Sequence, residues 1–528
     1  MKRALKRLLG EVPLTAETYW WLRQRGQPVT GFRLKQLVPL LPQWVVQARQ
    51  AASDTPPGKR VFVFATLHHW LASTTALSLA LAGLGHRVTL GYLPYRDWQR
   101  HYDRFDLRRA DAYARWVLRP MRSVVRLQSL LGRRAATLPR ALAEAVRQVA
   151  VYDVQYTRQV ERVDENDPLF RLRLQRNTAA ASALLAEWLQ HRPDVVIIPN
   201  GMILEFGAAL QTARFLNIAV TTYEFGEQRE RVWLDRNRSV MLQDTTALWQ
   251  AVRHQPLTEE QEERIRALFA ARRGGKLWAN FARRWQNAPS AGGEQARAAM
   301  NLDPRRPVFL LATNVLGDSL VLGREIFTPS LAEWVRQTVR YFARHPEAQL
   351  VVRIHPGEQR TDGPSLAEVV RPEMAPNIRL VPADSSLNTY DLIEIADAGL
   401  VFTTTVGLEM AMSGLPVVVA GRTHYRQRGF TFDPETLDDY FRVLDALITG
   451  PARHRPDEAR VRLAWKYAYH FFFDYPRPYP WHHVYRGEDF QRWSIADSLA
   501  RDDFRATFEA FVGRPLPWET PSAASAHN

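Results

Sequence analysis

The chain has 528 residues, of which 46% are hydrophobic and 24% charged, a balance typical of a folded protein with more than one hydrophobic core. It contains no cysteine, which excludes disulfides, thiolate metal sites and cysteine nucleophiles and fits a reducing compartment. The formal net charge of +15 favours anionic partners, although the arginine bias of a GC-rich genome explains the same excess.

The first 55 residues are expected to form a helical N-terminal extension. Leu5, Leu8 and Leu9 stand among lysines and arginines, so this segment is either a lid helix packed on its own domain or a helix at an anionic membrane surface. No apolar run reaches the roughly 18 to 20 residues that span a bilayer, and no secretory signal is expected. We therefore expect a cytoplasmic protein, with the membrane alternative placing it at the inner face of the cytoplasmic membrane.

Residues 56–286 show the alternation of strands and helices expected of an α/β domain. Continuously apolar runs are typical of strands buried on both faces, and they predict strands at residues 60–65, 88–93, 194–199 and 218–222. Helices are expected at residues 76–82 and 208–215. Residues 96–190 are arginine-rich with helical periodicity, which predicts a helical insertion.

The same alternation returns after a Pro/Ser/Gly-containing linker at residues 287–294. A second domain is expected at residues 295–455, with strands at 308–312, 350–354, 378–381, 399–402 and 416–420 and helices at 331–343, 387–396 and 407–413. Residues 456–528 should form a helical and aromatic tail whose last ten or so residues are disordered. The fold class expected is α/β, with two doubly wound Rossmann-like domains facing a cleft.

Open α/β sheets bind ligands at the carboxyl ends of their strands, so polar residues at those ends are candidate site residues. One expected strand ends in Thr403, Thr404 and Thr405, and a helix containing Gly407 and Glu409 follows. Threonine hydroxyls and the N–H groups of a helix start favour an anion, and Glu409 is placed to accept hydrogen bonds from a ribose diol. The alternative is a simple helix cap with a solvated glutamate.

Two further segments follow strands of the second domain. Arg353-Ile-His355-Pro356 ends a strand, and the proline holds His355 in an extended conformation from which it could serve as a phosphate donor or a proton shuttle. A later loop contains Arg422, His424 and Tyr425; it suits a diphosphate or an anionic sugar, or it is a solvated basic loop.

Carboxylates that follow strands are candidates for acid–base chemistry. Asp318, after Thr313-Asn314, is a candidate base or a turn-forming residue. In the first domain, Glu205 and Glu224 are candidate catalytic groups. We identify no metal motif, no Walker-type phosphate loop and no nucleic-acid-binding module. His68 and His69 are adjacent on a segment expected to be extended, so a shared metal ion is not expected.

The stretch from Val308 to Asp433 resembles the capsule polysaccharide biosynthesis family, which is related to bacterial enzymes that transfer Kdo or sialic acid. The resemblance rests on several short pieces in order: Thr-Asn and then Asp at 313–318, Ile-His-Pro at 354–356, Ser386 to Leu392, Thr-Thr-Val-Gly-Leu-Glu at 404–409, and Gly-x-x-His-Tyr followed by Gly-Phe-Thr at 421–431. Asn-Gly at 200–201 and Glu-Phe-Gly at 224–226 look like the first domain's counterpart.

The resemblance implies a GT-B fold and a metal-independent glycosyltransferase that uses a CMP- or UDP-linked sugar as co-substrate, with no cofactor. It implies that the second domain holds the donor, with His355, Pro356 and the threonines at the phosphate and Glu409 at the ribose. The first domain would take a glycan or glycolipid acceptor. A nucleotide-sugar 2-epimerase of the same fold, or a non-catalytic polysaccharide-binding or assembly factor, are the alternatives.

Overall fold

The computed structural model describes residues 2–24, 27–53, 55–132, 136–281, 289–361 and 363–519. The chain forms two compact units, and neither is continuous in sequence. Unit 1 comprises residues 1–153, 164–241 and 476–516, and unit 2 comprises residues 154–163, 242–475 and 517–528. The domain limits expected from the sequence stay predictions. The C-terminal disorder that we expect falls almost entirely on residues 520–528, outside the described residues.

Unit 1 is built on a seven-stranded sheet in the order β12-β6-β5-β4-β1-β2-β3. Neighbouring strands from β5 to β3 are parallel, whereas β6 and β12 add antiparallel pairs at one edge. The chain lays down strands to one side of β1 and then to the other side, so the topology reverses between β1 and β4. The strands are β1 (Arg60–Thr66), β2 (Arg87–Leu93), β3 (Val125–Ser129), β4 (Val195–Pro199), β5 (Ala219–Glu224), β6 (Arg231–Arg236) and β12 (Arg477–Pro478).

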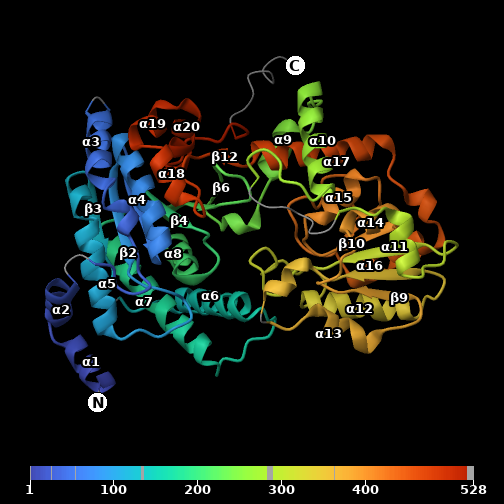
Figure 1. Ribbon diagram of the computed structural model, residues 1–528, viewed down its shortest axis with the longest axis horizontal. Coiled ribbons are helices and arrows are strands. Elements are labelled where there is room, and N and C mark those ends of the chain that lie inside the picture. The colour runs from blue at the N-terminus through green and yellow to red at the C-terminus, as the bar shows by residue number, and fades with distance from the viewer. Residues whose placement is uncertain are drawn as a thin grey trace. The chain divides into compact units, whose positions relative to one another are not determined.

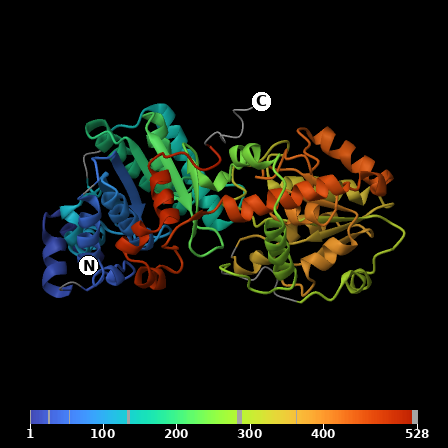
Figure 2. The same ribbon diagram turned by 90° about the horizontal axis from the view of Figure 1, so that it is seen from above.

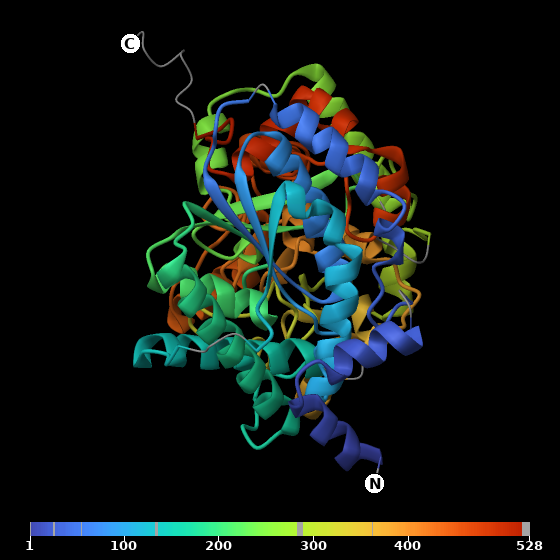
Figure 3. The same ribbon diagram turned by 90° about the vertical axis from the view of Figure 1, so that its left-hand side faces the viewer.

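Helices cover both faces of this sheet, which explains why β1 and β4 are apolar at almost every position. Figure 3 shows the strands between two layers of helices. The helices that lie wholly or mainly in unit 1 are α1 (Lys2–Glu11), α2 (Thr15–Gln24), α3 (Leu41–Ala52), α4 (His68–Gly83), α5 (Arg104–Val117), α6 (Arg140–Arg158), α7 (Pro168–Gln190), α8 (Leu204–Phe215), α18 (Arg486–Arg492), α19 (Ile495–Ala500) and α20 (Asp502–Phe511).

The C-terminal helices of unit 1 pack against the beginning of the chain. Helix α19 contacts both α3 and α4, and α20 contacts α4. Figures 1 and 2 show these helices in red beside the blue N-terminal helices. Trp44 of α3 and Trp481 are both buried, with ring centroids 6.1 Å apart. The part of the C-terminal tail from residue 476 to residue 516 therefore belongs to unit 1, and Trp481 lies in its core.

Unit 2 contains a five-stranded, all-parallel sheet in the order β11-β10-β7-β8-β9. Its topology reverses between β7 and β10. The strands are β7 (Val308–Ala312), β8 (Gln349–Arg353), β9 (Ile378–Val381), β10 (Ala398–Val401) and β11 (Val417–Val419). Its helices are α9 (Thr246–Val252), α10 (Glu259–Arg273), α11 (Gly293–Ala299), α12 (Leu331–Ala343), α13 (Leu366–Val370), α14 (Thr389–Ile395), α15 (Val406–Met412), α16 (Leu437–Thr449) and α17 (Glu458–Tyr469).

The expected α/β class, with a doubly wound sheet in each half of the chain, is confirmed. The prediction that residues 96–190 are wholly helical is wrong, because β3 lies within them and pairs with β2. Strand β3 has only one buried residue, Val125, so it lacks the apolar run that marks the inner strands. The residues 68–69 are not extended either, since α4 begins at His68.

Candidate functional site

In the sheet of unit 2 the strand order reverses between β7 and β10. This point, the topological switch point of the sheet, brings two predicted site segments together. Asn314 follows β7 and Thr403 follows β10, and these two strands are neighbours across the reversal in strand order. The side-chain Oδ1 of Asn314 accepts a hydrogen bond of 3.2 Å from the backbone N–H of Thr403. Because open α/β sheets bind ligands outside the carboxyl ends of their strands at such a point, this edge is the candidate site.

His355 is held beside the same loop by a second side-chain bond. Its backbone N–H donates to Thr313 Oγ1 over 2.9 Å, and its Nδ1 accepts from the backbone N–H of Gly357, also over 2.9 Å. An imidazole whose Nδ1 is an acceptor carries its proton on Nε2 when neutral. His355 thus has the tautomer of a hydrogen-bond donor through Nε2. Pro356 begins the short helical turn that follows.

At the carboxyl ends of β8 and β10, two buried polar atoms have no hydrogen-bond partner among the described residues. They are Oγ1 of Thr403 and Nε of Arg353. Arg353 donates through Nη1 to the carbonyl of Pro382, and burial lowers the pKa of its guanidinium to about 10, so it stays charged at neutral pH. Leaving such groups unpaired costs free energy, and the polar atoms of a ligand would satisfy them.

The loop after β11 presents one cation and buries the rest of its predicted residues. Arg422 is exposed, and its backbone is fixed to the buried Arg324 by two bonds of 2.8 Å, one in each direction. Arg324 was not singled out in the sequence, where nothing distinguishes it from other arginines. Its effect is to hold Arg422 at the edge of the sheet.

His424 and Tyr425 lie inside the protein and support the loops. The ring of His424 stacks on Phe471 at 3.7 Å, and its Nδ1 lies 2.9 Å from the hydroxyl of Tyr467. The hydroxyl of Tyr425 donates to the carbonyl of Thr404 over 2.6 Å. A Cβ at position 407 would lie 2.3 Å from that hydroxyl, so this close packing requires Gly407.

Glu409 lies one turn into α15 and is buried in a polar cluster. Its Oε1 is 2.7 Å from Nη1 of Arg272, and its Oε2 accepts from the hydroxyl of Tyr390 over 2.8 Å. Arg272 comes from α10, and no pattern in the sequence pairs it with Glu409. The cluster fixes α15 against its neighbours, whereas the ribose contact expected for Glu409 stays a prediction.

The remaining predicted residues of unit 2 have local roles. Thr404 is buried and Thr405 half-buried, directly before α15. Asp318 accepts a bond of 2.8 Å from the backbone N–H of Leu320 through its carboxylate, which is the geometry of a turn-forming residue. Its role as a base stays a prediction.

In unit 1 the structure joins Asn200, which follows β4, to Glu224, which is the last residue of the adjacent strand β5. The amide Nδ2 of Asn200 donates to Oε2 of Glu224 over 3.0 Å, and the backbone N–H of Phe225 donates to Oε1 over 3.0 Å. Burial raises the pKa of Glu224 to about 7 in spite of these two bonds, which act in the opposite direction. A carboxyl group with such a pKa can take up or release a proton near neutral pH.

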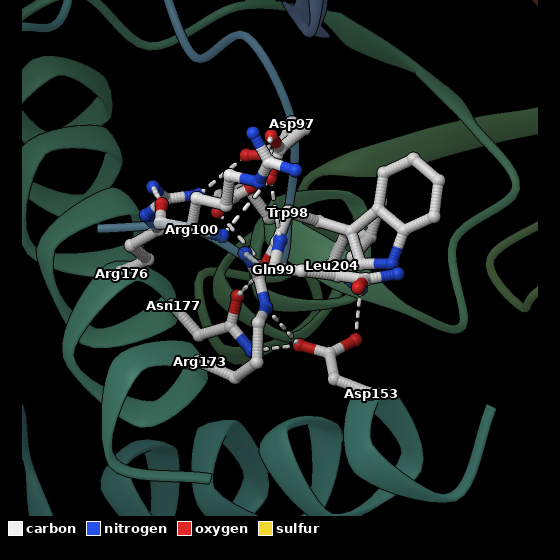
Figure 4. A network of polar contacts seen from close by, with 10 residues as sticks. Asp97, Trp98, Gln99, Arg100, Asp153, Arg173, Arg176, Asn177 and Leu204 are labelled. Atoms are coloured by element: carbon white, nitrogen blue, oxygen red, sulfur yellow. Dashed lines mark hydrogen bonds and ion pairs between the residues drawn. The ribbon is translucent and has the colours of Figure 1, made fainter. Parts of the chain in front are cut away.

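Glu205, the other glutamate predicted in unit 1, is part of a fully buried ionic network. Arg173 lies 2.8 Å from Glu205 and 2.9 Å from Asp153, and all three side chains are almost completely buried. Figure 4 shows Arg173 and Asn177 both pointing at the Asp153 carboxylate, which also accepts from the backbone of Leu204. This network ties α6 and α7 to the start of α8, so the geometry favours a structural role for Glu205.

Histidines gather with aromatic rings near the carboxyl ends of β1 and β5. His483 stacks on Trp70 with ring centroids 4.1 Å apart and lies 5.0 Å from His69. Burial, helped by the charge of nearby Arg486, lowers the pKa of His68 to about 4, and burial with the neighbouring His68 lowers that of His69 to about 3. These rings are therefore neutral at physiological pH and form an apolar and hydrogen-bonding surface.

No group of three or more His, Asp or Glu side chains is placed to hold a metal ion among the described residues. None of the helices in the described ranges combines the length and the apolar character needed to cross a bilayer.

No protein-family model and no curated protein sequence matches this chain. Among solved structures, the KpsC beta Kdo 2,4 transferase of Thermosulfurimonas dismutans is 17% identical, with a TM-score of 0.37 over 61% of this chain and 87% of its own. The UDP-GlcNAc 2-epimerase of Neisseria meningitidis bound to UDP-GlcNAc is 12% identical, with a TM-score of 0.24 over 79% of this chain and 99% of its own. A glycosyltransferase of Rickettsia africae is 8% identical, with a TM-score of 0.27 over 86% and 97%.

Proposed function

We propose that this protein is a glycosyltransferase of capsule or surface polysaccharide biosynthesis that takes its sugar from a CMP- or UDP-linked donor. One observation carries the proposal. Side chains from segments that resemble the capsule family, Asn314 and Thr313, bind the backbones of Thr403 and His355 at the switch point of the unit 2 sheet. The family resemblance thus coincides with the place where this fold class binds ligands.

The donor phosphates are assigned to groups at this edge that can donate to oxygen. These are the hydroxyl of Thr403, Nε2 of His355 and the guanidinium groups of Arg353 and Arg422. Arginine forks match phosphate oxygens, and charge-assisted bonds are stronger than neutral ones. The leaving nucleotide gains negative charge as the glycosidic bond to phosphate breaks, so these donors would stabilise the transition state. The proposal needs no metal ion and no cofactor.

The acceptor is assigned to unit 1, with Glu224 as the general base. In the transfer step the acceptor hydroxyl attacks the anomeric carbon of the donor sugar. A new C–O bond forms, the bond from that carbon to the donor phosphate breaks, and the hydroxyl proton passes to the Glu224 carboxylate. The raised pKa of about 7 supports this role, because a base works best when its pKa lies near the working pH.

The exposed apolar side chains at the N-terminus support a further part of the proposal, which is contact with the inner face of an anionic membrane. Within the described residues, Leu8, Val12, Leu14, Tyr19, Trp21 and Leu22 are all exposed, Trp21 by 67%. We call these six residues the N-terminal apolar patch. Trp and Tyr favour the bilayer interface, and the basic residues of the segment favour anionic lipid.

A turnover assay tests the proposal. The purified protein is incubated with CMP- and UDP-sugars, with and without capsule oligosaccharide acceptors, and the products are followed by mass spectrometry. The proposal expects nucleotide release and acceptor elongation together, both lost in Glu224→Gln. Conversion of the donor sugar without any acceptor would contradict it and indicate the epimerase instead.

A further inference from the structure

A basic groove lies at the amino-terminal edge of the unit 1 sheet. It encloses about 770 Å³ and is formed by the starts of β1, β2 and β3, the turn before β3 and the end of α7. This volume falls within the range of roughly 300–1,000 Å³ that is typical of ligand sites. We call it the basic groove and define it by its five arginines and the two other ionisable residues of its lining: Arg60, Arg87, Arg122, Arg126, Arg192, His191 and Glu187.

The groove carries a strong excess of positive charge. Five arginines line it, and Glu187 is the one carboxylate in its lining. Glu187 is buried, with Oε1 at 3.3 Å from Arg126 and at 3.4 Å from His191. Asp194, at the rim, pairs with Arg60 at 2.8 Å. Most of the guanidinium charge therefore has no internal counterpart.

The groove arginines differ in whether their side chains already bind other residues of the protein. Arg192 donates to the carbonyls of Leu216 and Asn217 over 2.8 and 2.9 Å. Arg87 and Arg122 are exposed, and neither forms a close ion pair within the described residues, although the charge of Arg87 helps to lower the pKa of Asp194. These two side chains are free to form bidentate bonds to the carboxylates of a ligand.

The basic groove is separate from the acid–base residues of unit 1. Strand β1 has seven residues, from Arg60 in the groove to Thr66 at the other edge of the sheet. At about 3.3 Å per residue the two edges are roughly 20 Å apart. Asn200 and Glu224 lie at the carboxyl edge, so a ligand in the groove does not occupy the place of the reacting acceptor hydroxyl.

We infer that the basic groove binds a segment of an acidic polysaccharide, a chain whose sugars carry carboxylates. This choice of occupant rests on the proposed function, in which a growing glycan is extended. A bilayer surface cannot enter a concave site. Single-stranded nucleic acid binding uses exposed aromatic rings for stacking, whereas Phe62, the only Phe, Tyr or Trp residue of the lining, is 2% exposed. A chain of linked uronic acids fits a groove with repeated guanidinium groups.

The test uses the full chain, a fluorescently labelled oligouronate and fluorescence anisotropy. The double variant Arg87→Glu/Arg122→Glu is compared with Arg49→Glu/Arg371→Glu, which makes the same change in net charge at exposed arginines elsewhere. The inference expects the groove variant to bind roughly tenfold or more weakly. It expects the control to change affinity by less than about twofold, a loss due only to long-range charge. If the groove variant does not fold, Arg87→Gln/Arg122→Gln replaces it.

Other outcomes overturn the inference. Equal losses in the two double variants would mean non-specific attraction, and displacement by a single-stranded oligonucleotide of equal charge would mean a nucleic-acid site. A neutral maltodextrin that binds as well as the oligouronate would also overturn it. Thermal stabilisation of the protein by nucleotides tests the donor site separately. If the protein binds the oligouronate in the groove but no nucleotide stabilises it, the inference about the groove is supported and only the proposed function is contradicted.

Discussion

Arg272 and Glu409 form a buried ion pair in unit 2, with 2.7 Å between Nη1 and Oε1. The pair joins α10 to α15, and the hydroxyl of Tyr390 completes the cluster. Glu409 is therefore anchored from two sides within the protein. This arrangement makes its contribution to folding measurable apart from any contact with a ribose.

Replacing Glu409 by glutamine leaves the Arg272 cation buried beside a neutral group. We expect the free energy of unfolding to fall by about 3–5 kcal/mol, as for other broken buried pairs, measured by urea denaturation. The matched control is Glu394→Gln, whose partner Arg273 lies 2.8 Å away on the surface with both side chains about half exposed. That change should cost about 0–1 kcal/mol. Similar losses in the two variants would contradict the buried role.

Thr313 should matter for ligand binding more than for folding. In Thr313→Val the backbone N–H of His355 loses its acceptor, which should loosen the His355 loop. We expect the free energy of unfolding to fall by about 1 kcal/mol and nucleotide affinity to fall roughly tenfold. The control Thr449→Val removes a hydroxyl of α16 that donates to the backbone carbonyl of Asp445. Isothermal titration that gives equal affinities for both variants would contradict the assignment of this edge.

Glu224 gives unit 1 a distinct dependence of stability on pH. Its pKa is about 7 in the folded protein against 4.5 for an ordinary glutamate, so the folded state holds the proton more tightly than the unfolded state. Stability contributed by this group is therefore lost as pH rises from about 4.5 through about 7. We expect Glu224→Gln to gain thermal stability over the wild type at pH 8 and little at pH 5.

The control for this measurement is Glu347→Gln, a change at an exposed glutamate. It measures the effect of exchanging a glutamate for a glutamine at the surface. His68 and His69 act in the opposite sense, because their lowered pKa values make the folded protein lose stability as pH falls below about 6.5. Comparing each variant with the wild type at the same pH removes that background. A Glu224→Gln difference that is flat from pH 5 to pH 8 would show that the carboxyl group is not perturbed.

The N-terminal apolar patch should bind anionic vesicles. We expect Trp21→Glu/Leu22→Glu to lose co-sedimentation with vesicles that contain phosphatidylserine, since both side chains are more than half exposed. The control Met374→Glu/Val484→Glu changes two exposed apolar residues outside the patch. Unchanged sedimentation of the patch variant, or equal loss in the control, would contradict membrane contact through residues 8–22.

Much of the fold could be predicted because the inner strands appear in the sequence as continuous apolar runs. The runs that became β4 and β7 are apolar throughout, and β1 is apolar between Arg60 and Thr66, since helices cover both faces of each sheet. Strand β6 was not predicted, because it mixes apolar residues with arginines and an aspartate near the antiparallel edge. Strands near an edge are solvated on one side, so their sequences lack the continuous apolar run that predicts an inner strand.

The candidate site could be predicted only in part. Thr403 and His355 follow strands, and strand ends are visible in a sequence. Their partners depend on which strands become neighbours, so the bond from Thr403 to Asn314 follows from the order of the sheet. The burial of a polar side chain also cannot be seen in the sequence. Glu205 was therefore a catalytic candidate, although Arg173 pairs with it inside the protein.

The most direct test of the central claim is thermal stabilisation of the purified protein by CMP, UDP, GDP and their sugars, repeated with His355→Ala and Thr403→Val. The account predicts that one nucleotide raises the melting temperature of the wild type and that both variants lose most of this response while remaining folded. A wild-type protein that responds to no nucleotide, or variants that respond as fully as the wild type, would contradict it.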